Sequence, residues 1–195
     1  KYTQGLLDVL DKYNVKATFF VTNTHPDYQN LIAEEAKRGH TVAIHSASHK
    51  YNQIYTSEQA FFDDLEQMNS IIKAQTGNDA SIIRFPGGSS NTVSKDYCPG
   101  IMTQLVNDVT ARGLLYCDWN VSSGDANNKP ISTDQVVQNV ISGVQSHNVS
   151  VVLQHDIKDF SVNAVEQIIQ WGQANGYTFL PLTTSSPMSH HRINN

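Results

Sequence analysis

The sequence predicts an α/β fold in which helices cover a set of parallel strands, and three observations support this. Helical patterns alternate with short apolar runs from residue 3 to residue 182, and such alternation favours a parallel sheet. Polar residues gather where the apolar runs end, as they do at the C-terminal face of a barrel. No G-x-G-x-x-G follows a predicted strand, which argues against a dinucleotide site. A doubly wound sheet and a barrel both fit this pattern.

Six segments are expected to be helical, because their apolar residues recur at helical spacing or because helix-ending residues bound them. Pro26 opens the second segment and Gly39 closes it, while Ser57 caps the third segment, which stops at Gly77. The six segments are 3–13, 26–39, 57–77, 99–113, 132–147 and 161–176.

Six short runs are expected to be strands, because β-branched and aromatic residues dominate them, as in "KATFFVT" and "HTVAIHS". In chain order they cover 16–22, 40–46, 81–85, 114–120, 149–156 and 177–182. The polar residues 183–195 that follow are expected to form a C-terminal tail.

Length and composition predict one domain over residues 1–182, and we expect a monomer. The chain has 195 residues, of which 39% are hydrophobic, enough for one sizeable core. Its net charge of −5 argues against a nucleic-acid partner. The chain contains no run of 18 apolar residues, so no membrane span is predicted. The many Asn, Ser, Thr and Gln residues fit an extracellular or cell-surface protein. Cys98 and Cys117 form either one disulfide or two buried thiols.

The segment "HSASH" places His45 and His49 four residues apart, just after a predicted strand. If the segment turns helically, the two imidazoles face the same way and can bind one cation. The alternative is a pair of polar histidines on the surface.

The segment "RFPGG" combines a buried cation with a tight turn. Arg84 ends an apolar strand, where an arginine needs a partner to offset its desolvation. Pro86, Gly87 and Gly88 predict a turn whose backbone N–H groups can donate to an oxyanion. The alternative is an ordinary loop in which Arg84 belongs to a structural ion pair.

Candidate partners for Arg84 follow the fourth predicted strand. Asp118 and Asp125 are the two carboxylates in this region, and Trp119 offers a flat wall of the kind that stacks on sugar rings. The alternative for Trp119 is a place in the core.

His155 ends the strand predicted over 149–156. A histidine there suits a general acid or base, because its charge changes near neutral pH. The neighbouring Asp156 is a candidate to fix its tautomer. The alternative for His155 is a hydrogen-bonded core histidine.

In order and spacing, these segments resemble the polysaccharide deacetylases of carbohydrate esterase family 4, the NodB-homology domain. "HSASH" is similar to that family's H-[ST]-x-x-H metal motif and "RFPGG" to R-x-P-x-G. "DWNVSSGD" is similar to the fourth motif and "LQH" to the fifth, L-x-H, while "LLDVLDKYNVKATFFV" resembles the first helix and second strand. The similarity runs from about residue 3 to residue 182.

The resemblance implies a distorted (β/α) barrel and a divalent metal, usually zinc with cobalt or nickel as alternatives, bound by an aspartate and two histidines. His45 and His49 match those histidines. It also implies hydrolysis of the acetyl groups of a polysaccharide, with release of acetate.

The same resemblance implies roles for four further residues. Arg84 would orient a catalytic aspartate and Asp125 would hold Arg84. The Gly87 N–H would support the oxyanion, and His155 would protonate the leaving amine.

The chain departs from the family pattern at two places. The first family motif, T-F-D-D-G, supplies the catalytic base and the third metal ligand, but no Asp-Asp-Gly occurs here. Asp63 and Asp64 fall in the middle of a predicted helix, and Asp8 and Asp11 lie on the first helix, so none replaces it. We therefore expect the first strand to be absent and the chain to be incomplete at its N-terminus. Ala126 stands where the fourth motif usually has a tryptophan that walls the acetyl pocket.

The predicted function is removal of N-acetyl groups from a cell-wall polysaccharide such as peptidoglycan or a chitin-like N-acetylglucosamine polymer. One alternative is a carbohydrate-binding domain that has lost its catalytic aspartates. The other is an O-acetyl esterase of the same fold that acts on xylan.

Overall fold

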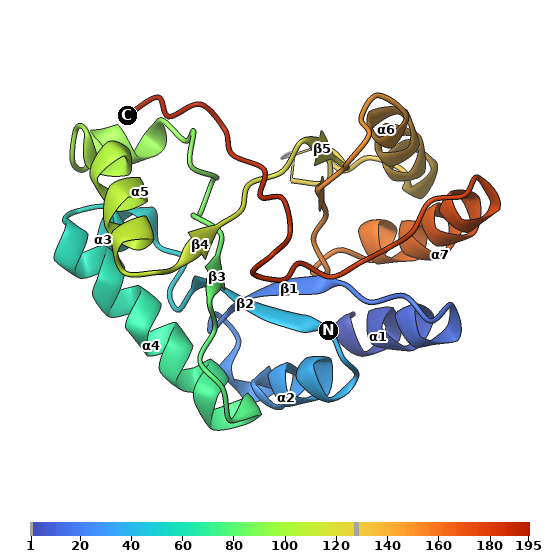
Figure 1. Cartoon of the computed structure of the whole chain (residues 1–195), viewed down its shortest axis with the longest axis horizontal. Coiled ribbons are helices and arrows are strands. Elements are labelled where there is room, and N and C mark those ends of the chain that lie inside the picture. The colour runs from blue at the N-terminus through green and yellow to red at the C-terminus, as the bar shows by residue number, and fades with distance from the viewer. Residues whose placement is uncertain (1, 127–128) are drawn as a thin grey trace. The chain divides into compact units, whose positions relative to one another are not determined.

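The computed structural model describes residues 2–126 and 129–195, which form two compact units. The first unit comprises the N-terminal segment up to Ala17 together with Trp119–Pro181. The second unit comprises Thr18–Asp118 together with Leu182–Asn195. Each unit has parallel strands and helices of its own (Figure 1). The predicted α/β class with parallel strands is therefore confirmed, while closure into a distorted barrel stays a prediction.

A four-stranded parallel sheet, in the order β1-β2-β3-β4, is the framework of the second unit. β1 and β2 are its long strands, and they pair from Thr18 opposite Thr41 to Val21 opposite Ile44. The strands are β1 (Thr18–Thr22), β2 (Thr41–Ser46), β3 (Ile82–Ile83) and β4 (Leu115–Tyr116). The helices are η1 (Pro26–Tyr28), α2 (Asn30–Lys37), α3 (Tyr51–Ile54), α4 (Glu58–Thr76), η2 (Val93–Asp96) and α5 (Ile101–Ala111).

Helix α4 carries the residues that bury one side of this sheet. It begins where the Ser57 hydroxyl accepts a hydrogen bond from the Ala60 N–H, at 3.1 Å, and it ends at Gly77 with φ of 80°. Both ends were predicted from these residues. Apolar side chains that recur every three or four positions fill the core: Phe61, Leu65, Met68 and Ile72.

The first unit contains a two-stranded parallel sheet, which β5 (Val121–Ser122) and β6 (Val152–Leu153) form. Its helices are α1 (Thr3–Lys12), α6 (Thr133–Gln145) and α7 (Asp159–Ala174). Helices α6 and α7 pack together over a small core, whose buried residues are Val136, Val137, Val140, Ala164 and Ile168.

Two predicted strands differ in the structure. The run 114–120 divides into β4 and β5, which belong to different sheets. The run 177–182 forms no strand, so that prediction was wrong. Pro181 has no N–H to donate to a ladder. Leu182 instead donates its N–H to the Thr18 hydroxyl, at 2.7 Å, and accepts from the Thr41 hydroxyl, also at 2.7 Å.

Residues 183–195, the expected polar tail, form no helix or strand but pack against other residues of the second unit. The His190 ring stacks on Tyr116 with centroids 4.0 Å apart, and the Asn195 carbonyl accepts from the Thr103 N–H at 2.9 Å. The boundary proposed at residue 182 stays a prediction.

The two cysteines are free thiols, Cys117 buried and Cys98 half-buried, so the disulfide alternative is excluded. Within residues 2–126 and 129–195, no helix is both long and apolar enough to span a membrane.

Candidate active site

The two histidines of the predicted metal motif lie where β2 ends, with ring centroids 5.0 Å apart. His45 Nδ1 is 2.7 Å from the Arg84 carbonyl oxygen. Because a carbonyl only accepts, Nδ1 carries the proton, and Nε2 is the nitrogen whose lone pair can bind a metal. His49 has φ of 54°, a left-handed conformation that is uncommon outside glycine and that recurs at functional sites.

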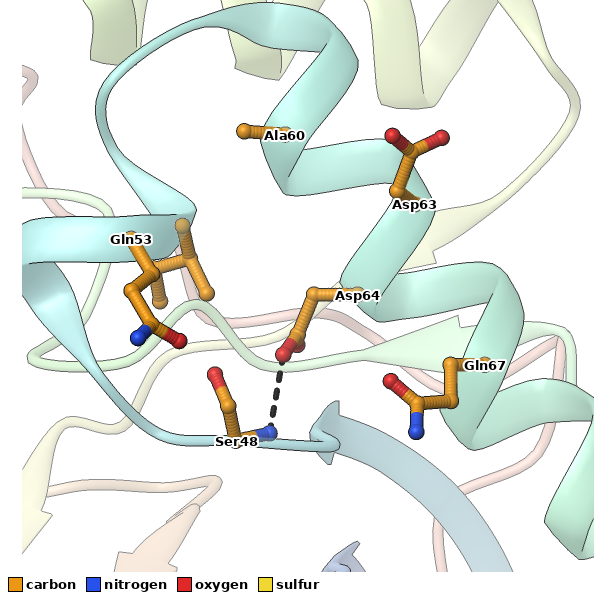
Figure 2. Close-up of a pocket in the computed structure, with 7 residues that line it drawn as sticks. Ser48, Gln53, Ala60, Asp63, Asp64 and Gln67 are labelled. Atoms are coloured by element: carbon orange, nitrogen blue, oxygen red, sulfur yellow. Dashed lines mark hydrogen bonds between the residues drawn. The ribbon is translucent and has the colours of Figure 1, made fainter.

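A carboxylate from α4 holds the turn between these histidines. Asp64 Oδ2 accepts from the Ser46 hydroxyl at 2.6 Å and from the Ala47 N–H at 2.9 Å, and Oδ1 accepts from the Ser48 N–H at 2.8 Å. Figure 2 shows Asp64 reaching from α4 to Ser48 beside a pocket. The Ser46 hydroxyl in turn accepts from the His49 N–H at 2.8 Å. Sequence analysis predicted only that Asp64 lies in the middle of a helix. Its role could not be predicted, because the tertiary fold sets the distance between Asp64 and residues 46–48.

Arg84 is buried, with 7% of its surface exposed, and lies at the end of β3. Its Nε donates to the Cys117 carbonyl and its Nη2 to the Asp118 carbonyl, both at 2.8 Å, and its guanidinium lies 4.0 Å from the centroid of the Phe20 ring. Burial lowers the pKa of Arg84 from its usual value. Asp118 is therefore a partner of Arg84 through its backbone carbonyl. Pairing between Arg84 and Asp125 stays a prediction.

The glycine turn after Arg84 has the conformation that the sequence predicted. Gly87 and Gly88 have φ of 78° and 79°, which favours glycine. A Cβ on Gly87 would also lie 2.8 Å from Tyr51 Oη and 3.1 Å from Asn91 Cβ. In the part of the chain that the structure describes, the exposed Gly87 N–H makes no hydrogen bond. It can therefore donate to an oxyanion.

The turn is anchored on both sides by buried groups. The Tyr55 hydroxyl donates to the Pro86 carbonyl at 2.7 Å. Asp118, fully buried, accepts from the Ser89 N–H at 2.8 Å, from the Ser89 hydroxyl at 2.5 Å and from the His191 N–H at 2.9 Å. The Asp118 carboxylate is thus a scaffold for this loop, a role that sequence reasoning missed.

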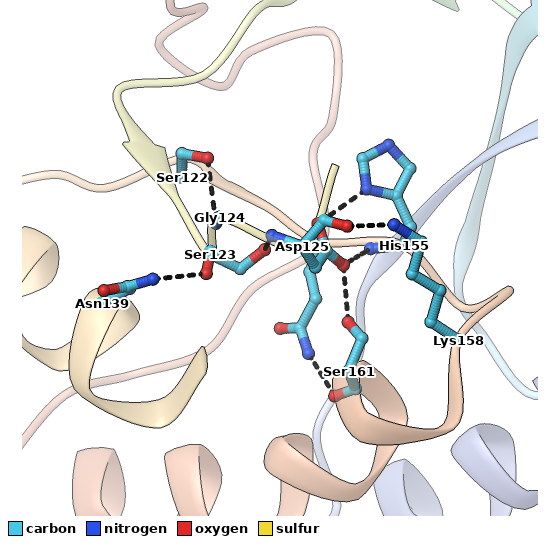
Figure 3. A network of polar contacts seen from close by, with 9 residues as sticks. Ser122, Ser123, Gly124, Asp125, Asn139, His155, Lys158 and Ser161 are labelled. Atoms are coloured by element: carbon cyan, nitrogen blue, oxygen red, sulfur yellow. Dashed lines mark hydrogen bonds and ion pairs between the residues drawn. The ribbon is translucent and has the colours of Figure 1, made fainter. Parts of the chain in front are cut away.

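Asp125 and His155 form a pair in the first unit (Figure 3). Asp125 Oδ1 lies 2.8 Å from His155 Nδ1, while Oδ2 accepts from the His155 N–H at 2.7 Å and from the Ser161 hydroxyl at 2.6 Å. The Lys158 ammonium donates to the Asp125 carbonyl. Only 1% of the Asp125 side chain is exposed, against 37% of the His155 side chain. Nε2 of His155 points away from Asp125 and is the nitrogen that can exchange a proton with a substrate.

The pKa of Asp125 reflects two opposing effects. Burial raises it, but the hydrogen bonds from His155 and Ser161 and the charge of His155 outweigh burial and lower the pKa to about 2. Asp125 is therefore ionised at neutral pH and holds the proton of His155 on Nδ1. The other candidate, Asp156, accepts from the Thr3 hydroxyl at 2.5 Å, so Asp125 is the residue that orients the imidazole.

Two features expected from the sequence remain predictions. Trp119 is half-buried, and its role as a wall for a sugar ring stays a prediction. The structure brings His45, His49, Arg84 and Gly87 together in the second unit and joins Asp125 to His155 in the first, while the meeting of these sets at one site stays a prediction.

Two side chains of the predicted metal site lie among the described residues. No group of three His, Cys, Asp or Glu side chains able to hold a metal ion occurs in residues 2–126 and 129–195. His45 and His49 offer two nitrogens. The third ligand, an aspartate that the resemblance implies, stays a prediction.

Comparison with known proteins identifies the family. The family described as "Polysaccharide deacetylase" matches residues 1–98. A crystal structure of the catalytic domain of peptidoglycan N-acetylglucosamine deacetylase from Eubacterium rectale is 97% identical, with a TM-score of 1.00 over 100% of this chain and 89% of that one. The chain belongs to the polysaccharide deacetylase family.

Two more distant relatives agree. A peptidoglycan-N-acetylglucosamine deacetylase of Bacillus cereus is 30% identical over 184 residues, which cover 92% of this chain and 64% of that protein. A crystal structure of a polysaccharide deacetylase from Bacillus cereus has a TM-score of 0.82 and 29% identity, covering 100% of this chain and 90% of that one. The chain thus spans slightly less than two thirds of the length of the first relative.

Proposed function

We propose that this chain is the catalytic part of a metal-dependent hydrolase that removes N-acetyl groups from peptidoglycan or a similar N-acetylglucosamine polymer and releases acetate. The observation that carries the proposal is the pair of Asp125 and His155, in which a buried, ionised carboxylate fixes the tautomer of a half-exposed imidazole. Such a pair is built for proton transfer. The names of the relatives support N-acetylglucosamine in peptidoglycan as the substrate.

The leaving group in this reaction is an amine, which needs a proton as the C–N bond breaks. In the proposal, His155 gives that proton from Nε2, because its Nδ1 is committed to Asp125 at 2.8 Å. The negative charge of Asp125 stabilises the imidazolium before transfer. Asp125 therefore acts through His155, which differs from the role that the resemblance gave it.

The acyl oxygen gains negative charge as the carbonyl carbon becomes tetrahedral. In the proposal, the Gly87 N–H donates to that oxygen, and a backbone donor of this kind contributes roughly 10²–10³ in rate where it has been removed in other enzymes. Arg84, held by two carbonyls, would orient the catalytic aspartate of the family motif, a residue that this sequence does not contain.

The cofactor we propose is a divalent metal, zinc most of all, with cobalt or nickel as alternatives. His45 and His49 would bind it, and the hydrogen bond from His45 Nδ1 to Arg84 is the usual way to orient a ligating imidazole. A bound metal of this type supplies Lewis-acid chemistry to an acyl group.

We further propose that the protein acts outside the cell or at the cell surface, because its polymer substrate is part of the wall.

The specific observation that favours the second candidate, a carbohydrate-binding domain without turnover, is the lack of a third ligand among the described residues. The third candidate, an O-acetyl esterase acting on xylan, differs in its substrate only.

Acetate release from three substrates separates these functions: peptidoglycan, oligomers of N-acetylglucosamine and acetylated xylan, each with zinc supplied. We expect release from the first two. His155→Gln should retain the fold and lower turnover by roughly 10²–10⁴-fold, the contribution typical of a general acid.

Release from xylan alone would establish the esterase. Binding of the glycans without any acetate would establish the binding domain and overturn the proposal.

A further inference from the structure

Tyr51, which belongs to none of the family motifs and has no part in the proposed mechanism, lies close to both His49 and the glycine turn at Gly87. Tyr51 is the first residue of α3. Its ring centroid is 5.6 Å from that of His49 and 5.7 Å from that of Tyr55, so its orientation is fixed by packing. Its hydroxyl reaches the glycine turn, 2.8 Å from the position that a Cβ on Gly87 would take.

We propose that Tyr51 is a substrate-contacting residue whose hydroxyl donates a second hydrogen bond, beside that of the Gly87 N–H, to the acyl oxygen of the substrate. The inference rests on the proposed function of this site. It adds a side-chain donor to the backbone donor and explains why this chain has no side chain at position 87.

The distances allow the two donors to share one oxygen. A backbone nitrogen lies about 2.5 Å from the Cβ of its own residue, so Gly87 N and Tyr51 Oη are separated by at most about 5.3 Å, since Oη is 2.8 Å from that Cβ position. Two donors that each lie about 2.9 Å from one acceptor can be up to about 5.8 Å apart. The hydroxyl is therefore within reach.

The hydroxyl is also available for this bond. Tyr51 is half-buried, and in the part of the chain that the structure describes its Oη makes no hydrogen bond to another residue. The neighbouring Tyr55 is different, because its hydroxyl is buried and donates to Pro86. Tyr55 therefore supports the turn, whereas the Tyr51 hydroxyl keeps its hydrogen for a ligand.

The test is Tyr51→Phe, which keeps the ring and its contacts with His49 and Tyr55. We expect the kcat for acetate release from N-acetylglucosamine oligomers to fall roughly 10- to 100-fold with little change in KM, because a hydrogen bond to an oxyanion strengthens in the transition state. Tyr28→Phe, at an exposed position on η1, is the matched control and should keep the wild-type kcat. A kcat/KM within twofold of wild type in Tyr51→Phe would overturn the proposal.

A binding measurement separates failure of this inference from failure of the proposed function. With tyrosine labelled at ¹³Cζ and zinc supplied, sodium acetate should shift one resonance, and that resonance should be absent from the spectrum of Tyr51→Phe. If the wild-type chain released no acetate but this resonance moved, the proposed function would fail and the contact would stand. A Tyr51 resonance that acetate leaves unmoved would overturn the contact.

Discussion

The Asp125 carboxylate is kept ionised by three hydrogen-bond donors that contact it. The His155 ring, the His155 backbone N–H and the Ser161 hydroxyl all lie within 2.8 Å of its oxygens. These bonds favour the ionised form so strongly that the pKa falls to about 2 even though burial opposes ionisation. The proposed proton transfer and the stability of the fold therefore depend on the same charge.

The first prediction concerns the pH dependence of stability in Asp125→Asn. Since the pKa falls from 3.8 in the unfolded chain to about 2 on folding, the wild-type carboxylate contributes about 2 kcal/mol of stability at neutral pH, at about 1.4 kcal/mol per pKa unit. A carboxylate with a lowered folded pKa stabilises the protein above its unfolded pKa. That contribution is lost as the pH falls from about 4 through about 2.

Chemical denaturation of both proteins, followed by circular dichroism from neutral to acidic pH, measures this. The variant should be less stable than wild type by about 2 kcal/mol at neutral pH, and the difference should shrink below about pH 4. Asp27→Asn, at an exposed position, controls for the loss of one charge. A difference that stays constant across the whole pH range would contradict the account.

Sequence reasoning at the residue scale singled out the groups that we propose to carry chemistry, but not all of their partners. His45, His49 and His155 could be recognised because strand ends and motif spacing depend on local sequence. The partner of His155 could not, because Asp156 is adjacent to it in sequence while Asp125 is 30 residues away and is brought to His155 by the pairing of β5 with β6.

At the scale of elements, the turn after β2 is held by a residue of α4. Asp64 accepts three hydrogen bonds from residues 46–48, two of them from backbone N–H groups. Buried donors that lose their acceptor cost about 1–3 kcal/mol each. The position of both histidines thus depends on where α4 packs.

The second prediction is that Asp64→Ala destabilises the chain by about 2–4 kcal/mol, because its donors are left without an acceptor. It should also weaken zinc binding by roughly 10-fold, as happens when groups that orient metal ligands are removed. Thermal unfolding and zinc titration measure the two effects. Asp63→Ala changes the exposed neighbouring carboxylate on the same helix. If Asp63→Ala and Asp64→Ala behaved alike, the role assigned to Asp64 would be wrong.

Helices were predicted better than strands. The ends of α4 follow from Ser57 and Gly77, whose side chain and backbone conformation act locally. The strands β3, β4, β5 and β6 are two residues long in the structure, shorter than the apolar runs that predicted them, because pairing depends on neighbours that the sequence does not reveal. The strand predicted over 177–182 does not form. Pro181, which has no N–H for a strand ladder, was a local signal against that strand.

On the scale of the whole molecule, the described residues form two compact units, each with its own parallel strands. The segment after Pro181 belongs to the second unit, although it follows the first unit in sequence. The sequence predicts one domain over residues 1–182 followed by a polar tail, and that division stays a prediction.

Membership of the polysaccharide deacetylase family could be predicted from ordered motifs alone, and it is confirmed. His45 and His49 are two of the ligands that the proposed metal would need. The metal is therefore the part of the proposed mechanism that a direct test addresses first.

That test is the rate of acetate release from peptidoglycan before chelation, after treatment with a chelator, and after zinc is restored. We expect release to fall to background on chelation and to return with zinc in the wild type, but not in His45→Ala, because His45 is one of the two residues proposed to bind the metal. Release that continues unchanged after chelation would contradict a metal-dependent deacetylase.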